Sequence, residues 1–185
     1  MTEPKPLTLR ELEAGLDSIR QSPRSEGILT MIVRRPKIDL REVLELGELT
    51  SLEGLVGDTW RTRGSSRTVD GSSHPDMQLT LINTRLIALV AQLKERWTLA
   101  GDQLVVDLDL SADNLPPGTP LMIGTAKLEV TAQPHTGCDK FAARFGIEAL
   151  KWVNSPTGKQ LRLRGLYAKV VESGAIQVGD KVRKT

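Results

Sequence analysis

Hydrophobic and polar residues alternate in several short segments, and this pattern predicts a β-rich fold. Residues 27–34 (GILTMIVR) are rich in branched side chains and end before Pro36, while residues 42–46 alternate polar with apolar. Further strands are predicted at residues 78–82, 106–110, 121–123, 127–130, 166–171 and 176–182. Glycine turns that are consistent with hairpins occur at Gly101-Asp102, Gly118-Thr119, Gly124-Thr125, Gly174-Ala175 and Gly179-Asp180, although turn composition does not fix which strands pair.

Helical spacing of apolar residues predicts three helices. Thr8 and Glu11 have the spacing of a capping box, and the pattern that follows ends at Pro23. Asn83 or Thr84 can cap a second helix with an apolar stripe. A third helix follows Cys138, with apolar residues four apart up to Val153.

These elements predict a mostly β protein with peripheral helices. No βαβ alternation is evident, so we expect a mixed, mostly antiparallel β-barrel or curled sheet with helices packed outside. Residues 1–25 would form an N-terminal helical extension and residues 26–185 a single domain, since no linker divides the chain.

Residues 58–77 form a long polar stretch that contains glycine and serine at Gly64, Ser65, Ser66, Gly71, Ser72 and Ser73. Compact domains seldom contain a loop of this length without a function. We therefore expect a binding role for this loop.

The amino-acid composition argues against several classes of protein. The 25 Lys and Arg against 23 Asp and Glu give a net charge of +2, with few aromatic residues and no dense basic tract, so nucleic-acid binding is poorly supported. No apolar run is long enough to predict a membrane-spanning helix. A single cysteine and a polar N-terminus favour a cytoplasmic protein.

Cys138 is the only cysteine, and it lies in a polar turn near His135 and Lys140. Neighbouring cations favour the thiolate, which is the nucleophilic and metal-binding form, so we expect a Cys138 pKa below its ordinary value. The alternative is that Cys138 fills a small gap in the core.

Several segments together resemble a MOSC domain, the module named for the C-terminal part of molybdenum cofactor sulfurases. They are residues 54–58 (GLVGD), the strands around 122–124 and 128–131, Pro134 with Cys138, residues 164–170 (RGLYAKV), and residues 174–180. The resemblance extends over about residues 27–182 and implies a MOSC-type mixed or antiparallel β-barrel. Many members have proline directly before the cysteine, whereas three residues separate Pro134 from Cys138 here, which predicts a differently shaped loop.

The resemblance implies that Cys138 is a molybdenum ligand of bound molybdenum cofactor (molybdopterin) or a sulfur carrier. A thiolate is a soft ligand suited to this metal, and it can also carry a persulfide. The chain has no pyridoxal-phosphate-binding half, so pyridoxal phosphate binding is not expected. Members that stand alone include reductases of N-hydroxylated bases, and such a reductase would need a separate electron donor because no flavin, iron–sulfur or nicotinamide motif is present.

A cofactor with a phosphate requires cationic donors, and Arg67 and Arg164 are the candidates, each with a solvated surface arginine as the alternative. Lys140 could contact phosphate or lower the thiol pKa, and His135 could exchange a proton with substrate, or be an ordinary turn histidine. Tyr167 is a further cofactor-binding candidate that could simply pack. We expect the loop at 58–77 to lie beside Cys138 and to provide Arg67.

Asp58 and the two histidines have less specific expectations. Asp58 is expected to close a turn by bonding its own backbone. A zinc site from His74, His135 and Cys138 is disfavoured because these residues lack the close-paired spacing of a zinc motif.

Two functions from different classes remain. In the first, the protein is a molybdenum-dependent reductase acting on an N-hydroxylated or related small molecule, with Cys138, His135 and Lys140 at the reaction centre. In the second, it is a non-catalytic carrier that receives sulfur from a cysteine desulfurase, or cofactor, at Cys138. Oligomeric state is not indicated by the sequence.

Overall fold

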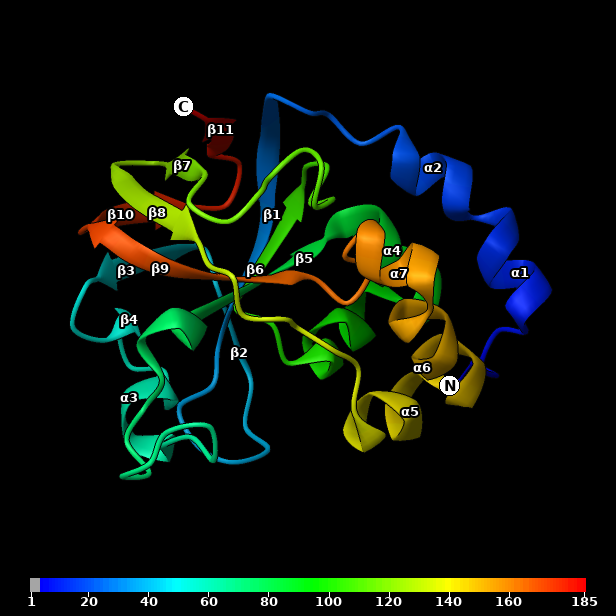
Figure 1. Ribbon diagram of the computed structural model, residues 1–185, viewed down its shortest axis with the longest axis horizontal. Helices are drawn as coiled ribbons and strands as arrows, with labels where there is room; N and C mark the ends of the chain where they lie inside the picture. Colours follow the sequence, from blue (N-terminus) through cyan, green and yellow to red (C-terminus); the bar gives the residue numbers. More distant parts are fainter. Residues whose placement is uncertain (1–3) are drawn as a thin grey trace.

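The computed structural model describes residues 4–185 and contains a closed barrel of seven strands (Figure 1). Around the barrel the strands are β1 (Glu26–Arg34), β11 (Lys181–Lys184), β7 (Pro120–Ile123), β8 (Ala126–Val130), β9 (Leu166–Glu172), β5 (Leu79–Asn83) and β6 (Leu104–Asp107). The pairing of β1 with β11 closes the ring. The expected mixed barrel is confirmed.

Two smaller pieces complete the β structure. Strand β2 (Glu42–Leu44) pairs with the end of β1, and β3 (Leu46–Thr50) pairs with β4 (Gly54–Leu55) and β10 (Gly174–Gln177) in a separate sheet. The stretch 42–46, predicted as one strand, is therefore divided between two sheets.

Apolar residues on alternate positions of the strands fill the barrel. Strand β8 buries Ala126, Leu128 and Val130, while Lys127 and Glu129 between them stay partly exposed. This is the period-two pattern that the sequence shows, and it assigns one face of each strand to the core.

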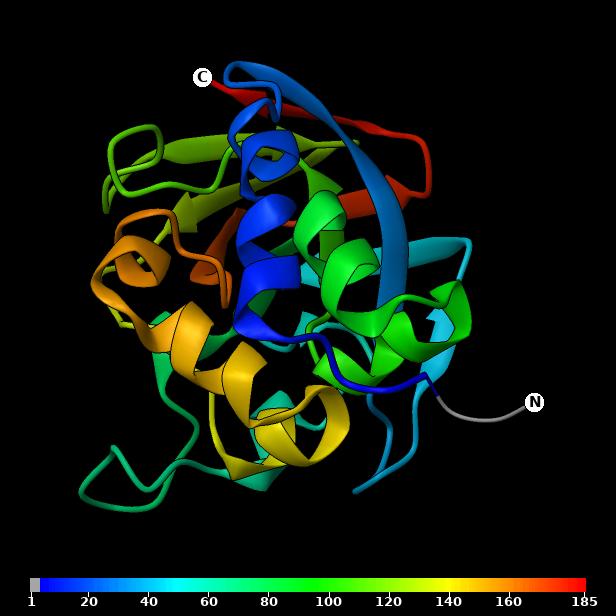
Figure 2. The ribbon, with the colours of Figure 1, turned by 90° about the vertical axis from the view of Figure 1, so that its right-hand side faces the viewer.

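Helices cover one side of the barrel, and Figure 2 shows them in front of the strands. They are α1 (Leu9–Ala14), α2 (Leu16–Arg20), α4 (Thr84–Ala91), the 3₁₀ segment η2 (Lys94–Ala100), α5 (Asp139–Phe145), α6 (Ile147–Asn154) and α7 (Pro156–Gln160). A second apolar core joins these helices to the outer face of the barrel, where Met31, Ile82 and Val105 point outward. The predicted extension at 1–25 begins in residues 1–3, outside the described residues, and its Leu12 is fully buried in this core.

Both predicted helix starts are confirmed. The Thr8 backbone N–H donates to Glu11 Oε2 at 2.8 Å, and the Glu11 N–H donates to Thr8 Oγ1. Asn83 Oδ1 accepts from the backbone N–H groups of Arg85 and Leu86, so Asn83 is the N-cap of α4. Each cap satisfies N–H groups that the helix itself leaves unpaired.

The expected absence of βαβ connectivity is wrong at one place. Strands β5 and β6 are parallel, and α4 with η2 forms the crossover between them. One βαβ unit among antiparallel strands produces no repeated alternation of strands and helices along the chain. The sequence pattern therefore did not indicate this parallel crossover.

Most of the predicted hairpins are also wrong. The Gly124-Thr125 turn joins the paired strands β7 and β8. The other turns join strands that pair elsewhere: Gly101 ends the parallel crossover, Gly118 precedes β7, Gly174 begins β10 and Gly179 leads into β11. Turn composition indicates a change of direction and not a partner.

The helix predicted after Cys138 is broken at Gly146. Its φ is 97°, and a Cβ there would stand 2.5 Å from Pro6 Cβ, so both the backbone conformation and the approach of the N-terminal segment require glycine. None of the helices in residues 4–185 has the length and apolar character needed to cross a membrane.

Candidate functional site

A polar cleft of about 190 Å³ opens at one end of the barrel. Its floor comes from the C-terminal end of β1 and from the starts of β5, β6 and β9. Its wall comes from the loop at 58–77, which contains the short helix α3 (Trp60–Arg63) and the 3₁₀ turn η1 (Pro75–Met77). The cleft is lined by Arg35, Trp60, Arg63, Gly64, Ser65, His74, Met77, Thr80, Gly101, His135, Arg164 and Tyr167. The expectation that the long loop contributes to a binding site is consistent with this arrangement.

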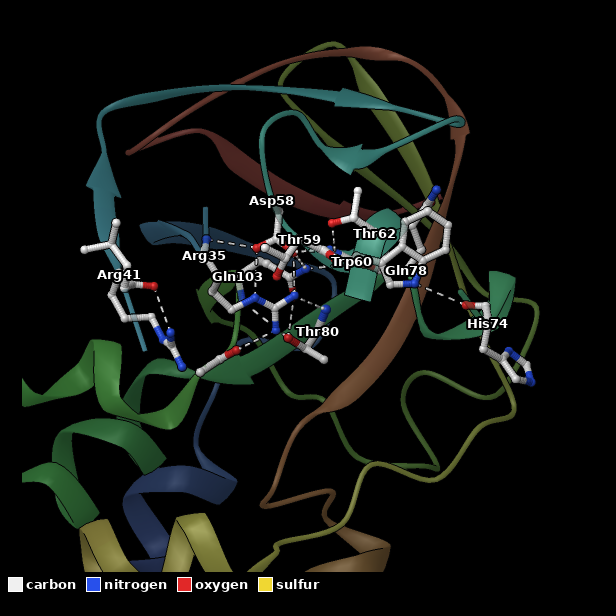
Figure 3. Close-up of polar contacts among 12 residues, drawn as sticks. Arg35, Arg41, Asp58, Thr59, Trp60, Thr62, His74, Gln78, Thr80 and Gln103 are labelled. Atoms are coloured by element: carbon white, nitrogen blue, oxygen red, sulfur yellow. Dashed lines mark hydrogen bonds and ion pairs between the residues drawn. The ribbon is translucent and has the colours of Figure 1, made fainter. Parts of the chain in front are cut away.

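The first buried ion pair of the floor joins Arg35 to Asp58 (Figure 3). Arg35 Nε donates to Asp58 Oδ2 at 2.8 Å and Nη2 donates to Oδ1 at 2.7 Å, with the two side chains 9% and 0% exposed. Asp58 Oδ1 also accepts from the Trp60 N–H at 2.9 Å. Asp58 therefore bonds its local backbone, as expected, and in addition fixes Arg35 against the cleft.

The second buried ion pair joins Arg164 to Asp102. Arg164 Nη1 lies 2.7 Å from Asp102 Oδ2, and Nη2 donates to the carbonyl of Ala100 at 3.0 Å. Burial raises the pKa of Asp102, and the Arg164 charge opposes that rise. The alternative of a solvated Arg164 is wrong, because its side chain is 8% exposed.

His135 lies between the Arg164–Asp102 pair and Tyr167. Its ring stacks on Tyr167 at 4.5 Å between centroids, and its Nδ1 lies 3.7 Å from Asp102 Oδ1 without a hydrogen-bond partner in residues 4–185. Burial, followed by the charges of Arg164, Arg35 and Arg67, lowers the pKa of His135 well below its ordinary value. His135 is therefore neutral at physiological pH and is not an exposed turn residue, so it adds no positive charge beside Cys138.

Tyr167 keeps its proton in the same surroundings. Burial raises the pKa of its phenol, and the negative charge of Asp102 adds to that rise. A protonated phenol and a neutral imidazole in contact can both donate and accept hydrogen bonds toward the cleft.

Arg63 is the cation of the cleft that has no carboxylate partner. It lies on α3, is exposed at the cleft mouth, and makes no ion pair within the described part of the chain. Partial burial of its guanidinium lowers the pKa of Arg63, and the charge of Arg35 adds to the decrease. An anion in the cleft would relieve this repulsion and accept from an otherwise free guanidinium.

The remaining predicted residues, Arg67, Cys138 and Lys140, do not line the cleft. Arg67 is exposed on the loop, and its charge contributes to the lowered pKa of His135 and opposes the rise in the pKa of Tyr167. Cys138 is exposed at the N-cap of α5, and Lys140 is exposed two residues further on, in the first turn of the helix. Three residues of chain span at most about 11 Å, so the Cα atoms of Cys138 and His135 are no further apart than that.

The structure thus brings His135, Arg164 and Tyr167 into one cleft, with Arg67 nearby. Sequence reasoning missed Arg35, Arg63 and Asp102, all of which complete it. Arg63 lies in the loop that the sequence marked as functional, so the only available signal was its position in that loop. Within residues 4–185, no three His, Cys, Asp or Glu side chains are grouped so that they could hold a metal ion.

Solved structures share the fold. The YUAD protein from Bacillus subtilis superposes with a TM-score of 0.60 at 14% identity, over 88% of this chain and 97% of that chain. YiiM from Escherichia coli gives a TM-score of 0.53 at 21% identity, over 85% and 69% of the two chains, and YiiM from Geobacillus stearothermophilus gives 0.51 at 15%, over 89% and 74%. No curated protein matches the chain in sequence.

The family model of the MOSC domain matches residues 68–183, which include His135, Cys138, Arg164 and Tyr167. Arg35, Asp58 and Arg63 precede the matched region, although they line or support the same cleft. The match extends over more than half of the sequence and agrees with the barrel topology. The chain therefore belongs to the MOSC domain family.

Proposed function

We propose that this protein binds the molybdenum cofactor at the cleft and acts as a small oxidoreductase that reduces N-hydroxylated or related compounds. Membership of the MOSC domain family supports a cofactor-related role. The observation that carries the proposal is a cleft with three guanidinium groups, one of which has no carboxylate partner.

The donor set fits an anionic group such as the phosphate of this cofactor. Arg63 has free donors at the mouth, while Arg164 Nε and His135 Nδ1 are buried polar atoms without a partner among the described residues. A buried donor left unpaired costs free energy, which a bound ligand or water would recover. Arg63 and Arg164 would hold the phosphate, and Arg67 would approach from the loop.

Cys138 would provide the protein ligand to molybdenum. When bound, the cofactor supplies a redox-active metal, and a thiolate is a soft ligand that suits it. Cys138 is separated from the cleft residue His135 by two residues only, so the Cα atoms of the two residues are at most about 11 Å apart, which supports this role.

His135 and Tyr167 would handle protons for the substrate. Neutral His135 has one ring nitrogen that can accept a proton, and Tyr167 can donate a hydrogen bond to a polar substrate atom. Electrons would come from a separate donor protein, as expected from the absence of a flavin, iron–sulfur or nicotinamide motif. Lys140 would contribute positive charge beside the thiol.

The exposure of Cys138 favours a second candidate function, that of a sulfur or cofactor carrier. An exposed thiolate is accessible to a cysteine desulfurase, and it would take the outer sulfur of the desulfurase persulfide while the desulfurase thiol is regenerated. In this function the cleft would bind cofactor for transfer, without turnover.

The test is metal and pterin analysis of protein purified from a host that makes the cofactor. We expect molybdenum and pterin in a constant ratio to the wild-type protein and their loss in Cys138→Ser, because a hydroxyl is a poor substitute for a soft thiolate. Wild-type protein without molybdenum would refute the ligand role, and persulfide on Cys138 after incubation with a cysteine desulfurase would then support the carrier.

The role of the loop is tested by Arg67→Ala, with Arg61→Ala on the outer side of α3 as the control. We expect Arg67→Ala to reduce cofactor retention, and bound cofactor to slow proteolysis of the loop. Equal retention in both variants, with proteolysis unaffected by cofactor, would mean that the loop does not contact the ligand.

A further inference from the structure

A second group of arginines lies at the edge of the cleft, next to Gly101. Gly101 lines the cleft at the end of η2, where its φ of 83° favours glycine. The point where a Cβ would stand on Gly101 is 3.8 Å from Arg41 Nη2 and 3.9 Å from Arg144 Nη1. Two guanidinium groups from separate segments, the β1–β2 connection and α5, therefore meet at this position.

These two arginines are not neutralised by the protein. Neither makes an ion pair in the part of the chain that the structure describes, and Arg41 Nε is buried there without a hydrogen-bond partner. Arg41 donates to the Leu40 carbonyl at 2.8 Å and Arg144 to the Leu99 carbonyl at 2.6 Å, which uses one donor of the five that each guanidinium has.

Two positive and two negative charges act on Arg41, and the positive ones have the larger effect. Burial lowers the pKa of Arg41, and the charges of Arg144 and Arg35 add to the decrease, while Asp39 and Asp58 oppose it. Asp58 is already bound by two nitrogens of Arg35. A cluster of like charges with free donors in partial burial is an arrangement that an anion stabilises.

The cluster adjoins the cleft at Gly101, which lines the cleft and lies near the guanidinium groups of Arg41 and Arg144. Arg35 Nη1 of the cleft donates to the Gly101 carbonyl at 2.9 Å. In the view of Figure 3, Arg41 lies on the opposite side of the Arg35–Asp58 pair from Trp60 and His74. A ligand in the cleft that extends past Gly101 would reach Arg41 and Arg144.

We propose that Arg41 and Arg144 form a second anion subsite, so that the ligand of this protein carries two phosphate groups or a diphosphate rather than a single phosphate. The proposal rests on the cleft being the anion site of the proposed function. The guanidinium fork matches phosphate oxygens, and two such groups near one point can bind one phosphate group together.

The test compares inorganic phosphate with pyrophosphate as probes at equal ionic strength, by calorimetry and by the intrinsic tryptophan fluorescence, to which Trp60 in the cleft contributes. We expect wild-type protein to bind pyrophosphate more tightly than phosphate. Arg41→Gln should weaken pyrophosphate binding about tenfold, the effect of losing one charge-assisted hydrogen bond, and change phosphate binding by less than about twofold. Arg144→Gln should act in the same way, and Arg10→Gln, the same charge change at an exposed site on α1, should change neither.

Arg63→Gln separates this proposal from the proposed function, because it should weaken binding of both probes. If Arg63→Gln leaves phosphate binding unchanged, the assignment of the cleft fails, while Arg41→Gln still decides the second subsite. If Arg41→Gln and Arg144→Gln weaken the binding of phosphate and of pyrophosphate equally, there is no second subsite. The same holds if both variants leave the binding of both probes unchanged. Thermal melting of each variant shows that the change in binding is not a loss of folding.

Discussion

The floor of the cleft and the segment that carries Cys138 are close in space but are held in different ways. The floor is fixed by two buried ion pairs, Arg35–Asp58 and Arg164–Asp102, each with further hydrogen bonds to backbone or side chains. Cys138 lies in irregular structure at the start of a helix, is exposed, and makes no capping bond. The charged groups of the floor are thus held in place by the protein itself, whereas the thiol is exposed. Substitutions in the floor should therefore affect stability, and substitutions at Cys138 should affect chemistry alone.

The largest effect is expected for Asp58→Ala. This change leaves Arg35 buried without its partner, and breaking a buried pair on one side costs about 3–5 kcal/mol. Urea denaturation would measure the free energy of unfolding. Asp17→Ala is the control, because it removes an exposed pair with Arg20, and we expect it to cost no more than about 1 kcal/mol. Equal losses in the free energy of unfolding for the two variants would show that the Asp58–Arg35 pair does not hold the floor of the cleft in place.

Arg63→Gln should have the next largest effect, on binding rather than on folding. Arg63 provides a free guanidinium to the cleft, so its loss should weaken phosphate binding about tenfold or more. Arg61→Gln is the matched control, since Arg61 is exposed on the same helix and does not line the cleft. Calorimetric titration that gives the same affinity for both variants would exclude Arg63 from the site.

A smaller effect is expected in the pH dependence of stability. The pKa of His135 is lower in the folded protein than in the unfolded chain, so the unfolded state binds more protons below a pH of about 6.5. His135 therefore contributes a loss of stability as the pH falls below this value, of at most about 1.4 kcal/mol per pH unit. Denaturation from pH 7.5 to 5 should show a shallower slope for His135→Gln than for wild type.

His74→Gln serves as the reference for this measurement, because it removes the other histidine and keeps the contribution of His135. A slope for His135→Gln that equals the wild-type slope would show that folding does not lower the pKa of His135.

The smallest effect on stability is expected for Cys138→Ser. Exposed substitutions without special contacts change the free energy of unfolding by about 0.5 kcal/mol or less. Alkylation of the native protein should modify Cys138 without prior unfolding. A large loss of stability, or a thiol that reacts only after denaturation, would mean that Cys138 packs in the core.

Local features of this protein were determined by the sequence alone. The alternation in β8, the capping box at Thr8 and the cap at Asn83 depend on residues a few positions apart, and all three are present in the structure. The motifs around Cys138 and residues 164–170 also indicated the family correctly. Such signals are readable because period, capping and short motifs involve neighbouring residues.

Tertiary structure decided the strand partners and most of the site. The parallel pair β5–β6 and the ring closure between β1 and β11 join strands that are far apart in sequence or separated by a helix, and no local pattern specifies them. Arg35 and Asp58 are separated by 23 positions and Arg164 and Asp102 by 62, so their pairing follows from the closure of the barrel. From the sequence alone, Arg35 and Arg164 cannot be distinguished from arginines that are exposed on the surface. Only their burial beside a specific carboxylate makes two of them the floor of a cleft, because a buried charge is retained when a partner stabilises it.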